Sequence, residues 1–334
     1  MLSLMKNSID IFQCPVCYGE LAIEDEYVIC VENKHRFDIV DDIPLMFVEG
    51  SDGEYSDRIT QKVKLFYEEN PFPNYDESDN PGLLIAKAES SVFAKLLNDE
   101  LPFNIRILEV GCGTGQMTNY LSLAHRYVFG VDLSLNSLLS ANNFKKRNSL
   151  KRSSFYQMNL FKPVFKVESF HAVICNGVLH HTHEAYAGLR VITKLIKKGG
   201  YIILGLYNRY GRLFTNIRRT IFSMTGSRLH FLDAYLRRQD ITYSKKKTWY
   251  LDQYENPYET THTFGEVLGW FEQTGIEFIS SIPEIGNILP LSDDYKLFSK
   301  KSRGNIITRL ISQLAMPFLT NKEGGFFIMI GRKK

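Results

Sequence analysis

An acidic residue followed by three alternating glycines is the most distinctive chemical pattern in the chain. Glu109 stands two residues before Gly111, and Gly113 and Gly115 follow at alternate positions. Glycine is needed where the backbone turns sharply and a ligand must approach without a Cβ in the way. A dinucleotide-binding turn has the different spacing G-x-G-x-x-G and places a pyrophosphate at a helix N-terminus. Glu109 would repel a phosphate, so the pattern favours a cationic ligand.

A second acidic residue lies about twenty positions beyond these glycines, where it closes the apolar stretch 127–132. At this place Asp132 can accept hydrogen bonds from both hydroxyls of a ribose. Asp132 or Ser134 could equally be the N-cap of the next helix. The agreement with Glu109 and the glycines favours the ligand-binding role.

Three cysteines and a histidine near the start of the chain have the spacing of a metal site. Cys14 and Cys17 form a C-x-x-C pair, and Cys30 and His35 form a C-x4-H pair after twelve intervening residues. Three thiolates and an imidazole suit a closed, tetrahedral structural zinc site. A redox dithiol and a disulfide are the alternatives, although an intracellular location disfavours a stable disulfide.

The elements that must hold these residues follow from the spacing of apolar positions. Residues 105–110 indicate a buried parallel strand, and the glycines lead into a helix from about Thr114. Residues 49–80 are polar and contain Gly and Pro, so we expect a linker and a flap over the ligand. Further strands are expected over 127–134, 153–160, 170–177, 201–207, 276–282 and 325–331. Helices are expected over 82–101, 135–147, 184–198, 264–275 and 306–314.

Residues 105–208 resemble the class I methyltransferases that use S-adenosylmethionine (SAM), whose first motif is E/D-x-G-x-G-x-G. SAM carries an α-ammonium and a sulfonium and has no phosphate, which agrees with an acid at position 109. The phrase N-G-V-L-H-H-T at 176–182 is similar to the motif that follows the family's fourth strand. The core is similar to methyltransferase types 11 and 25. The resemblance implies that SAM is bound by Glu109, Gly111, Gly113, Gly115, Asp132, Leu133, Asn159, Leu160 and Asn176.

One of these positions departs from the family pattern. Asn159 stands where the family usually has an aspartate for the adenine amino group. The amide oxygen of asparagine can accept the same hydrogen bond.

The resemblance also implies the fold class and the division of the chain. We expect an α/β protein with a Rossmann-like, seven-stranded class I methyltransferase core, whose final strand is antiparallel and forms a hairpin with the sixth. Residues 1–48 are expected to form a zinc-knuckle module and residues 49–100 a linker with N-terminal helices. Residues 101–334 are expected to form the methyltransferase domain, with a basic helical insert at 209–263.

The N-terminal pattern has a resemblance of its own, over about residues 12–48. The C-x-x-C knuckle resembles the N-terminal zinc finger of the ribosomal RNA guanine methyltransferases. The phrase H-R-F-D-I-V-D-D-I-P-L-M at 35–46 is similar to the small zinc-binding activators of tRNA and protein methyltransferases. These resemblances imply a structural Zn²⁺ and make an RNA or translation-apparatus substrate an alternative.

Composition narrows the class of protein. A length of 334 residues suggests two domains at roughly 150 residues each, and 44% apolar with 23% charged residues is typical of soluble proteins. The net charge of +3 does not by itself indicate nucleic acid. The N-terminus lacks the apolar core of a signal peptide, and no stretch reaches the roughly 18–20 apolar residues that span a membrane. We expect a cytoplasmic protein, of an oligomeric state that the sequence does not indicate.

Positive charge is concentrated in the insert. Residues 209–247 contain ten Lys or Arg and two Asp, an excess of eight positive charges. A basic amphipathic helix could face nucleic acid, an anionic lipid surface or a phosphorylated small substrate. A solvated face with an aliphatic core side is the simpler explanation.

Methyl transfer to a hydroxyl or amide-like nitrogen requires removal of a proton. His180 and His181 are the nearest candidates for the base because imidazole titrates near neutral pH, and packing around the cofactor is their alternative role. Tyr207 and His262 are further candidates.

We therefore expect a SAM-dependent methyltransferase that acts on an oxygen or nitrogen of a small metabolite, which could be anionic. An RNA methyltransferase that holds RNA with its zinc module and basic insert is one alternative. A non-catalytic SAM-binding scaffold is another. Contact with an anionic membrane surface is compatible with each of them.

Overall fold

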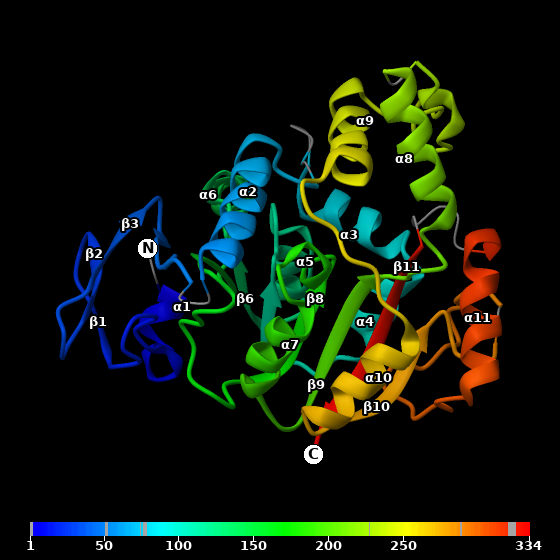
Figure 1. Cartoon of the computed structure of the whole chain (residues 1–334). Helices are drawn as coiled ribbons and strands as arrows, with labels where there is room; N and C mark the ends of the chain where they lie inside the picture. The colour runs from blue at the N-terminus through cyan, green and yellow to red at the C-terminus, as the bar shows by residue number, and fades with distance from the viewer. Residues whose placement is uncertain are drawn as a thin grey trace.

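A seven-stranded sheet forms the centre of the computed structural model (Figure 1). The structure describes residues 3–50, 53–73, 75, 79–226, 228–287, 289–319 and 325–334. Across the sheet the strand order is β10-β11-β9-β8-β5-β6-β7. The strands are β5 (Arg106–Val110), β6 (Tyr127–Asp132), β7 (Ser153–Gln157), β8 (Phe170–Asn176), β9 (Ile196–Tyr207), β10 (Ile276–Ile282) and β11 (Phe326–Lys333).

The direction of the strands confirms the predicted topology. β7, β6, β5, β8 and β9 pair in parallel, and β11 is antiparallel to both β9 and β10. Every residue of β7 is buried, because helices and the N-terminal segment cover its faces. The fold is therefore the α/β, Rossmann-like class I methyltransferase fold, with a small antiparallel sheet at its N-terminus.

Two apolar cores lie on opposite faces of the sheet because side chains alternate along each strand. Ile107 packs with Leu121 of α5 on one face, whereas Leu108 packs with Leu189 of α7 on the other. The helices are α1 (Ser3–Lys6), α2 (Glu54–Glu69), α3 (Pro81–Glu89), α4 (Val92–Glu100), α5 (Gln116–Leu123), α6 (Leu135–Arg147), α7 (Ala185–Lys194), α8 (Leu213–Thr225), α9 (Tyr243–Tyr250), α10 (Phe264–Gln273) and α11 (Ile306–Leu319). Within the described ranges no helix is long and apolar enough to cross a membrane.

Among the predicted helices, one is divided in the structure, two end earlier than expected, and the helix expected over 306–314 extends to Leu319. The helix expected over 82–101 is divided into α3 and α4, because the side chain of Ser91 accepts a hydrogen bond from the Ala94 N–H and starts a new helix. The helix expected over 184–198 ends at Lys194, and β9 begins at Ile196. Gly199, at φ +75°, lies in the irregular first part of this strand, where the pairing with β8 shifts register.

The predicted linker over 49–80 contains a helix of sixteen residues, α2. Its sequence is mostly polar, which favours a linker, but Tyr55, Ile59, Val63 and Tyr67 recur at the four-residue spacing of a helix. Ile59 and Val63 are both buried. α2 extends beside α6 and toward the insert (Figure 1).

The N-terminal module contains the second sheet, which consists of β1 (Leu21–Ile23), β2 (Tyr27–Cys30), β3 (Arg36–Val40) and β4 (Ile43–Pro44). It is joined to the outer strand β7, since the Met46 N–H donates to the Gln157 carbonyl at 3.0 Å. The ring of Phe12 enters the main core, with its centroid 5.1 Å from Tyr156 and 4.8 Å from Phe165. The module therefore packs against the edge of the main sheet (Figure 1).

Candidate functional site

A cavity of about 610 Å³ lies where β5, β6, β8 and β9 end. Its walls come from the glycine turn, α2, the loop at Phe72 and Pro73, and the insert. The predicted SAM-binding residues that line it are Glu109, Gly111, Gly113, Asp132, Leu133, Asn159, Leu160 and Asn176. Gly115 lies behind the wall as the N-cap of α5, at φ +71°, where a Cβ would be 2.7 Å from Ala141 Cβ and from the Phe155 ring.

The glycine turn needs its glycines for conformation and for space. Gly111 and Gly113 have φ values of +65° and +52°, which side-chain-bearing residues rarely adopt. A Cβ on Gly113 would lie 2.2 Å from the carbonyl oxygen of Phe72. The loop after α2 thus passes directly over the turn, and the Thr114 hydroxyl donates a hydrogen bond to the Pro73 carbonyl.

Glu109 and Asp132 present carboxylates to this cavity. The Thr118 hydroxyl donates to Glu109, and burial raises the pKa of Glu109 to about 7. Asp132 accepts hydrogen bonds from the N–H groups of Gly113 at 2.8 Å and Ser134 at 2.9 Å, and burial raises its pKa to about 6. Ser134, not Asp132, is the N-cap of α6. Both carboxylates would be stabilised by a positively charged ligand.

Two amide side chains complete this part of the cavity. The Asn159 Nδ2 donates to the Val48 carbonyl at 3.0 Å, and its Oδ1 accepts from the Phe161 N–H at 3.1 Å. The same oxygen can accept one further hydrogen bond. The Oδ1 of Asn176 is buried without a hydrogen-bond partner among the described residues. A ligand that donates a hydrogen bond would satisfy it.

The two predicted catalytic histidines lie in different surroundings. His181 lines the cavity, and its Nδ1 is 2.7 Å from the Tyr258 carbonyl oxygen. A carbonyl only accepts, so Nδ1 carries the proton and Nε2 is the acceptor nitrogen. Burial lowers the pKa of His181 and keeps the ring neutral.

His180 lies outside the cavity wall. Its ring centroid is 4.2 Å from that of Tyr207, and neither of its ring nitrogens has a hydrogen-bond partner among the described residues. Burial lowers its pKa well below the usual value. His262, also outside the wall, is 2.9 Å from the Thr260 hydroxyl, whereas Tyr207 lines the cavity. Of the two histidines, His181 alone is placed to contact a bound substrate.

A polar network at the insert side of the cavity was not predicted from the sequence. Tyr67 OH donates to Asp252 Oδ1 at 2.9 Å, and Gln253 Nε2 donates to both Asp252 Oδ2 at 2.9 Å and Tyr207 OH at 2.8 Å. Asp252 lies in a π-helical turn over Leu251–Glu255 that continues α9. The aromatic density of residues 249–254 indicates a lid, but no motif marks Asp252 as a cavity residue.

The aromatic residues of the predicted linker also reach the cavity. From the sequence, such aromatics could cap the cofactor pocket or contact substrate, and anchoring of the linker on the core is the favoured role. In the structure Tyr67 and Phe72 both line the cavity. α2 carries Tyr67 to the cavity, and the loop that follows α2 carries Phe72.

Two arginines of the insert are paired with a buried carboxylate. Arg212 is fully buried and forms an ion pair with Glu259 at 2.5 Å, and Arg219 pairs with the same carboxylate at 3.0 Å. The Arg212 guanidinium also lies 3.7 Å from the centre of the Tyr207 ring. Further insert arginines are paired in Arg209–Glu266, at 2.9 Å, and Arg238–Asp240, at 2.5 Å. Four of the ten basic side chains of residues 209–247 thus take part in these ion pairs.

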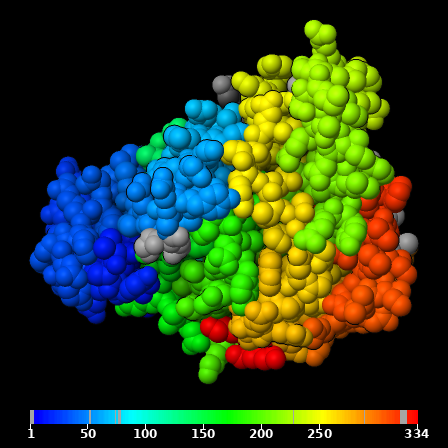
Figure 2. All heavy atoms as spheres, in the orientation of Figure 1, coloured from blue at the N-terminus to red at the C-terminus, as the bar shows by residue number. Residues whose placement is uncertain are grey.

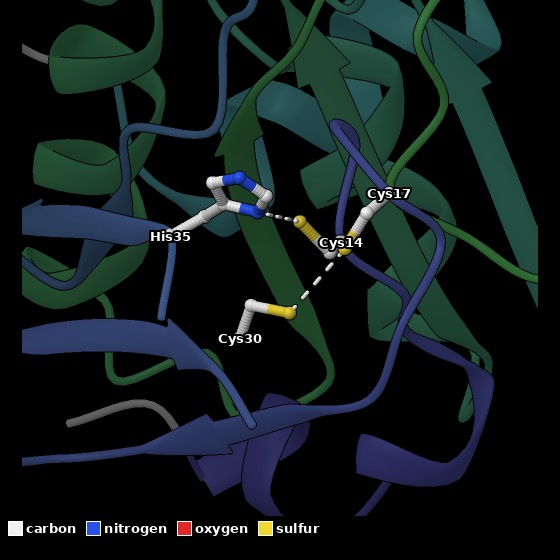
Figure 3. Close-up of side chains that lie close together, drawn as sticks. All are labelled: Cys14, Cys17, Cys30 and His35. Atoms are coloured by element: carbon white, nitrogen blue, oxygen red, sulfur yellow. Dashed lines mark hydrogen bonds between the residues drawn. The ribbon is translucent and has the colours of Figure 1, made fainter. Parts of the chain in front are cut away.

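The four predicted metal ligands converge in the N-terminal module (Figure 3). The Cys14 Sγ is 3.4 Å from the His35 Nδ1, the Cys17 Sγ is 3.4 Å from the Cys30 Sγ, and all four ligand atoms lie within 4.8 Å of one another. Around a tetrahedral zinc, ligand atoms would be roughly 3.3–3.8 Å apart. A hydrogen bond from Asn33 lowers the pKa of Cys17 to about 6, whereas burial raises that of Cys14 to about 11. All five cysteines are free thiols.

Comparisons with known proteins agree with the fold and the glycine turn. Residues 108–204 match a family model described as a methyltransferase domain. The uncharacterised protein syc1184_c of Synechococcus sp. is 24% identical over 307 residues, which are 81% of this chain and 72% of that protein. The ubiquinone biosynthesis O-methyltransferase of Glaesserella parasuis is 24% identical over 148 residues, 42% of this chain and 62% of that enzyme.

Among solved structures, PKMT2 from Rickettsia typhi is similar with a TM-score of 0.51 and 17% identity, over 73% of this chain and 52% of that one. Its complex with AdoHcy gives a TM-score of 0.50 and 17% identity, over 69% of this chain and 49% of that one. The chain thus spans about half the length of PKMT2. Taken with the topology, these likenesses show the class I methyltransferase fold, with a match to a methyltransferase domain over residues 108–204.

Proposed function

We propose that this protein transfers the methyl group of SAM to an oxygen or nitrogen atom of a small molecule. One observation carries the proposal: a single cavity is bordered both by Glu109 and Asp132 and by His181. α2 and the insert meet over this part of the molecule (Figure 2). A volume of about 610 Å³ is within the usual range of small-molecule sites.

The residues around the glycine turn suit SAM by their chemistry. Glu109 would hold the α-ammonium, since a buried carboxylate with a raised pKa gains from a cationic partner. Asp132 would accept the ribose hydroxyls, and Asn159 the adenine amino group. The unpartnered oxygen of Asn176 fits a ligand that brings a donor into the cavity. These roles follow from the resemblance and from the placement of the residues.

We assign His181 as the general base. SAM supplies a sulfonium methyl group, whose carbon–sulfur electron pair returns to sulfur while the acceptor atom forms its bond to carbon. The proton that leaves the acceptor goes to His181 Nε2, which is the free acceptor nitrogen when Nδ1 donates to Tyr258. From there it passes to solvent when the product leaves.

We also propose that Cys14, Cys17, Cys30 and His35 hold a structural Zn²⁺. The convergence of their ligand atoms supports this role. The closed ligand set leaves no coordination position for a substrate. The zinc would fix the hairpin of β1 and β2 against β3. Because the module is joined to β7, the zinc would also stabilise the edge of the main sheet.

RNA is a less well supported substrate. The zinc module and the basic insert are the features that favour it. Against it, Arg212 is fully buried, and Arg212 and Arg219 share the carboxylate of Glu259 instead of being available for phosphates. A cavity of about 610 Å³ also suits a small molecule.

The proposal is tested by incubating the protein and methyl-labelled SAM with an extract of its source cells. We expect label in the small-molecule fraction, in amounts that nuclease and 0.5 M salt leave unchanged. Label released from the macromolecular fraction by nuclease would show RNA methylation instead. SAM binding without transfer to any fraction would support the scaffold alternative.

A further inference from the structure

We infer that Asp252 determines which acceptor substrate enters the cavity. The site takes a neutral or cationic aromatic molecule that bears a hydroxyl or amine, and it rejects molecules with an anionic group near the reacting atom. This inference rests on the proposed function, whose substrate class it narrows.

Asp252 is placed to bind a ligand. Its side chain is buried, 6% exposed, and it lines the cavity. Oδ1 accepts one hydrogen bond from Tyr67 and Oδ2 accepts one from Gln253, both at 2.9 Å. Each carboxylate oxygen can accept a second hydrogen bond. The network therefore fixes the carboxylate in position and leaves it able to accept from a substrate.

The neighbouring groups are complementary to a hydroxyl or an amine. Tyr207 OH accepts from Gln253 Nε2, and no acceptor for its own proton is found among the described residues. Burial raises the pKa of Tyr67 and of Tyr207, so both phenols stay protonated. The insert side of the cavity therefore offers a substrate three groups. They are the carboxylate of Asp252, the neutral acceptor Nε2 of His181 and the phenolic donor of Tyr207.

The charges around the cavity oppose an anionic substrate. Among the described residues, the charged side chains that line it are three acids, Glu109, Asp132 and Asp252, and one base, Lys87. Lys87 already forms an ion pair with Asp79, whose side chain is 3% exposed. A carboxylate or phosphate beside Asp252 would be buried against like charge, which is costly in a low-dielectric site.

The nearest insert cation does not change this balance. Arg212 lies behind the ring of Tyr207 and does not line the cavity. It is neutralised by Glu259. The positive charge of the insert therefore gives no reason to expect an anionic substrate.

Aromatic rings form the remaining wall at this end. Tyr67, Tyr207, Trp249 and Phe326 come from α2, β9, α9 and β11, and all four line the cavity. Such rings favour a flat apolar body and attract a cationic substituent. Together with a carboxylate, they suit an aromatic alcohol or amine.

Three matched probes test the inference: tyramine, p-cresol and 4-hydroxybenzoate, which share a phenol and are cationic, neutral and anionic. Their affinities for the protein saturated with S-adenosylhomocysteine are measured by ligand-observed NMR. We expect tyramine and p-cresol to bind at least about tenfold more tightly than 4-hydroxybenzoate, since like charge costs more than about 1.4 kcal/mol in such a site.

Asp252→Asn, which preserves size and the bond from Tyr67, should reduce that preference about tenfold while the affinity for S-adenosylhomocysteine is unchanged. The surface variant Asp293→Asn should retain the wild-type preference for tyramine and p-cresol over 4-hydroxybenzoate. Tighter binding of 4-hydroxybenzoate, an unchanged preference in Asp252→Asn, or failure of all three probes to bind would overturn the inference. Failure to bind S-adenosylhomocysteine at all, measured first, would instead contradict the proposed function.

Discussion

The Tyr67 hydroxyl donates a 2.9 Å hydrogen bond to Asp252, a residue 185 positions later in the chain. The next residue, Glu68, accepts hydrogen bonds of 2.8 Å from the N–H groups of Leu135 and Asn136 at the start of α6. Two consecutive residues of α2 thus connect the helix to both sides of the cavity. α2 thus forms a strap between the insert and the start of α6.

Replacing Tyr67 by phenylalanine should loosen this strap. A hydrogen bond to a charged group contributes about 1.5–3 kcal/mol, so we expect SAM to dissociate about tenfold faster from Tyr67→Phe. Stopped-flow measurement of SAM release tests this. Tyr243→Phe, at a side chain 81% exposed, is the matched control and should release SAM at the normal rate. Equal rates for the two variants would show that the strap does not control release.

SAM affinity should depend on pH through Glu109. Its pKa of about 7 means that the carboxyl loses its charge as pH falls from 8 to 6.5, and with it the attraction for a cationic ligand. The dissociation constant should rise several-fold over this range, measured by calorimetry. Glu109→Gln should bind more weakly at pH 8 and show a flatter profile. A wild-type constant that does not change with pH would remove Glu109 from this role.

In the protein without ligand, the carboxyl of Glu109 should give stability a pH dependence opposite to that of SAM affinity. Its folded pKa exceeds the value of 4.5 for an unperturbed carboxyl, so between pH 4.5 and 7 the folded state binds more protons than the unfolded state. Stability from this group therefore increases as pH falls through 7 and decreases as pH rises. The difference in unfolding free energy between wild type and Glu109→Gln should show this trend in chemical denaturation.

His181→Asn should separate binding from chemistry. The asparagine Nδ2 can still donate to the Tyr258 carbonyl, but the acceptor nitrogen that takes the proton is lost. We expect methyl transfer to fall by about 10²–10⁴-fold at an unchanged SAM affinity, as measured with labelled SAM. His180→Asn is the comparison, since its ring is outside the cavity wall. A normal rate in His181→Asn would rule it out as the base.

The metal cluster should contain one zinc per chain by elemental analysis. Cys30→Ser should lose the metal and lower the melting temperature by about 5 °C or more, since loss of a structural metal is among the most destabilising changes. Exchange of amide hydrogens should increase along β7, to which the module is joined. Cys175→Ala, at a cysteine outside the cluster, should retain the zinc. Metal-free wild-type protein of unchanged stability would contradict the assignment.

Glu259 should be essential for stability of the insert. Although burial alone would raise its pKa, Arg212 and Arg219 hold it below the usual value. Glu259→Gln leaves the buried Arg212 without a countercharge and should destabilise the protein by about 3–5 kcal/mol in urea denaturation. Asp240→Asn, at an exposed pair, should have no measurable effect. Equal stabilities of the wild type and Glu259→Gln would show that the buried ion pair does not stabilise the protein.

The sequence was most informative where chemistry and backbone shape require the same residues. Gly111 and Gly113 have positive φ values, so only glycine fits, and Glu109 and Asp132 follow at fixed places after buried strands. Their position at one cavity could therefore be predicted. The convergence of Cys14, Cys17, Cys30 and His35 was equally predictable, because the two members of each pair are close together in the sequence.

The insert side of the cavity could not be predicted in this way. Asp252 becomes a cavity residue only through contacts with Tyr67 and Gln253, and no local pattern specifies a contact across 185 positions. α2 is polar in composition, as linkers are, although Tyr55, Ile59, Val63 and Tyr67 recur at a helical spacing that indicates a helix. The pairing of Arg212 with Glu259 is likewise tertiary, and sequence alone shows only the excess of basic residues.

The central proposal is that one cavity holds SAM beside the acceptor substrate. A crystal structure of the complex with S-adenosylhomocysteine tests it most directly. We predict the ribose at Asp132, the amino group at Glu109, and the sulfur directed toward His181 and Asp252. Binding of the ligand outside this cavity, or with its sulfur directed away from His181, would contradict the account.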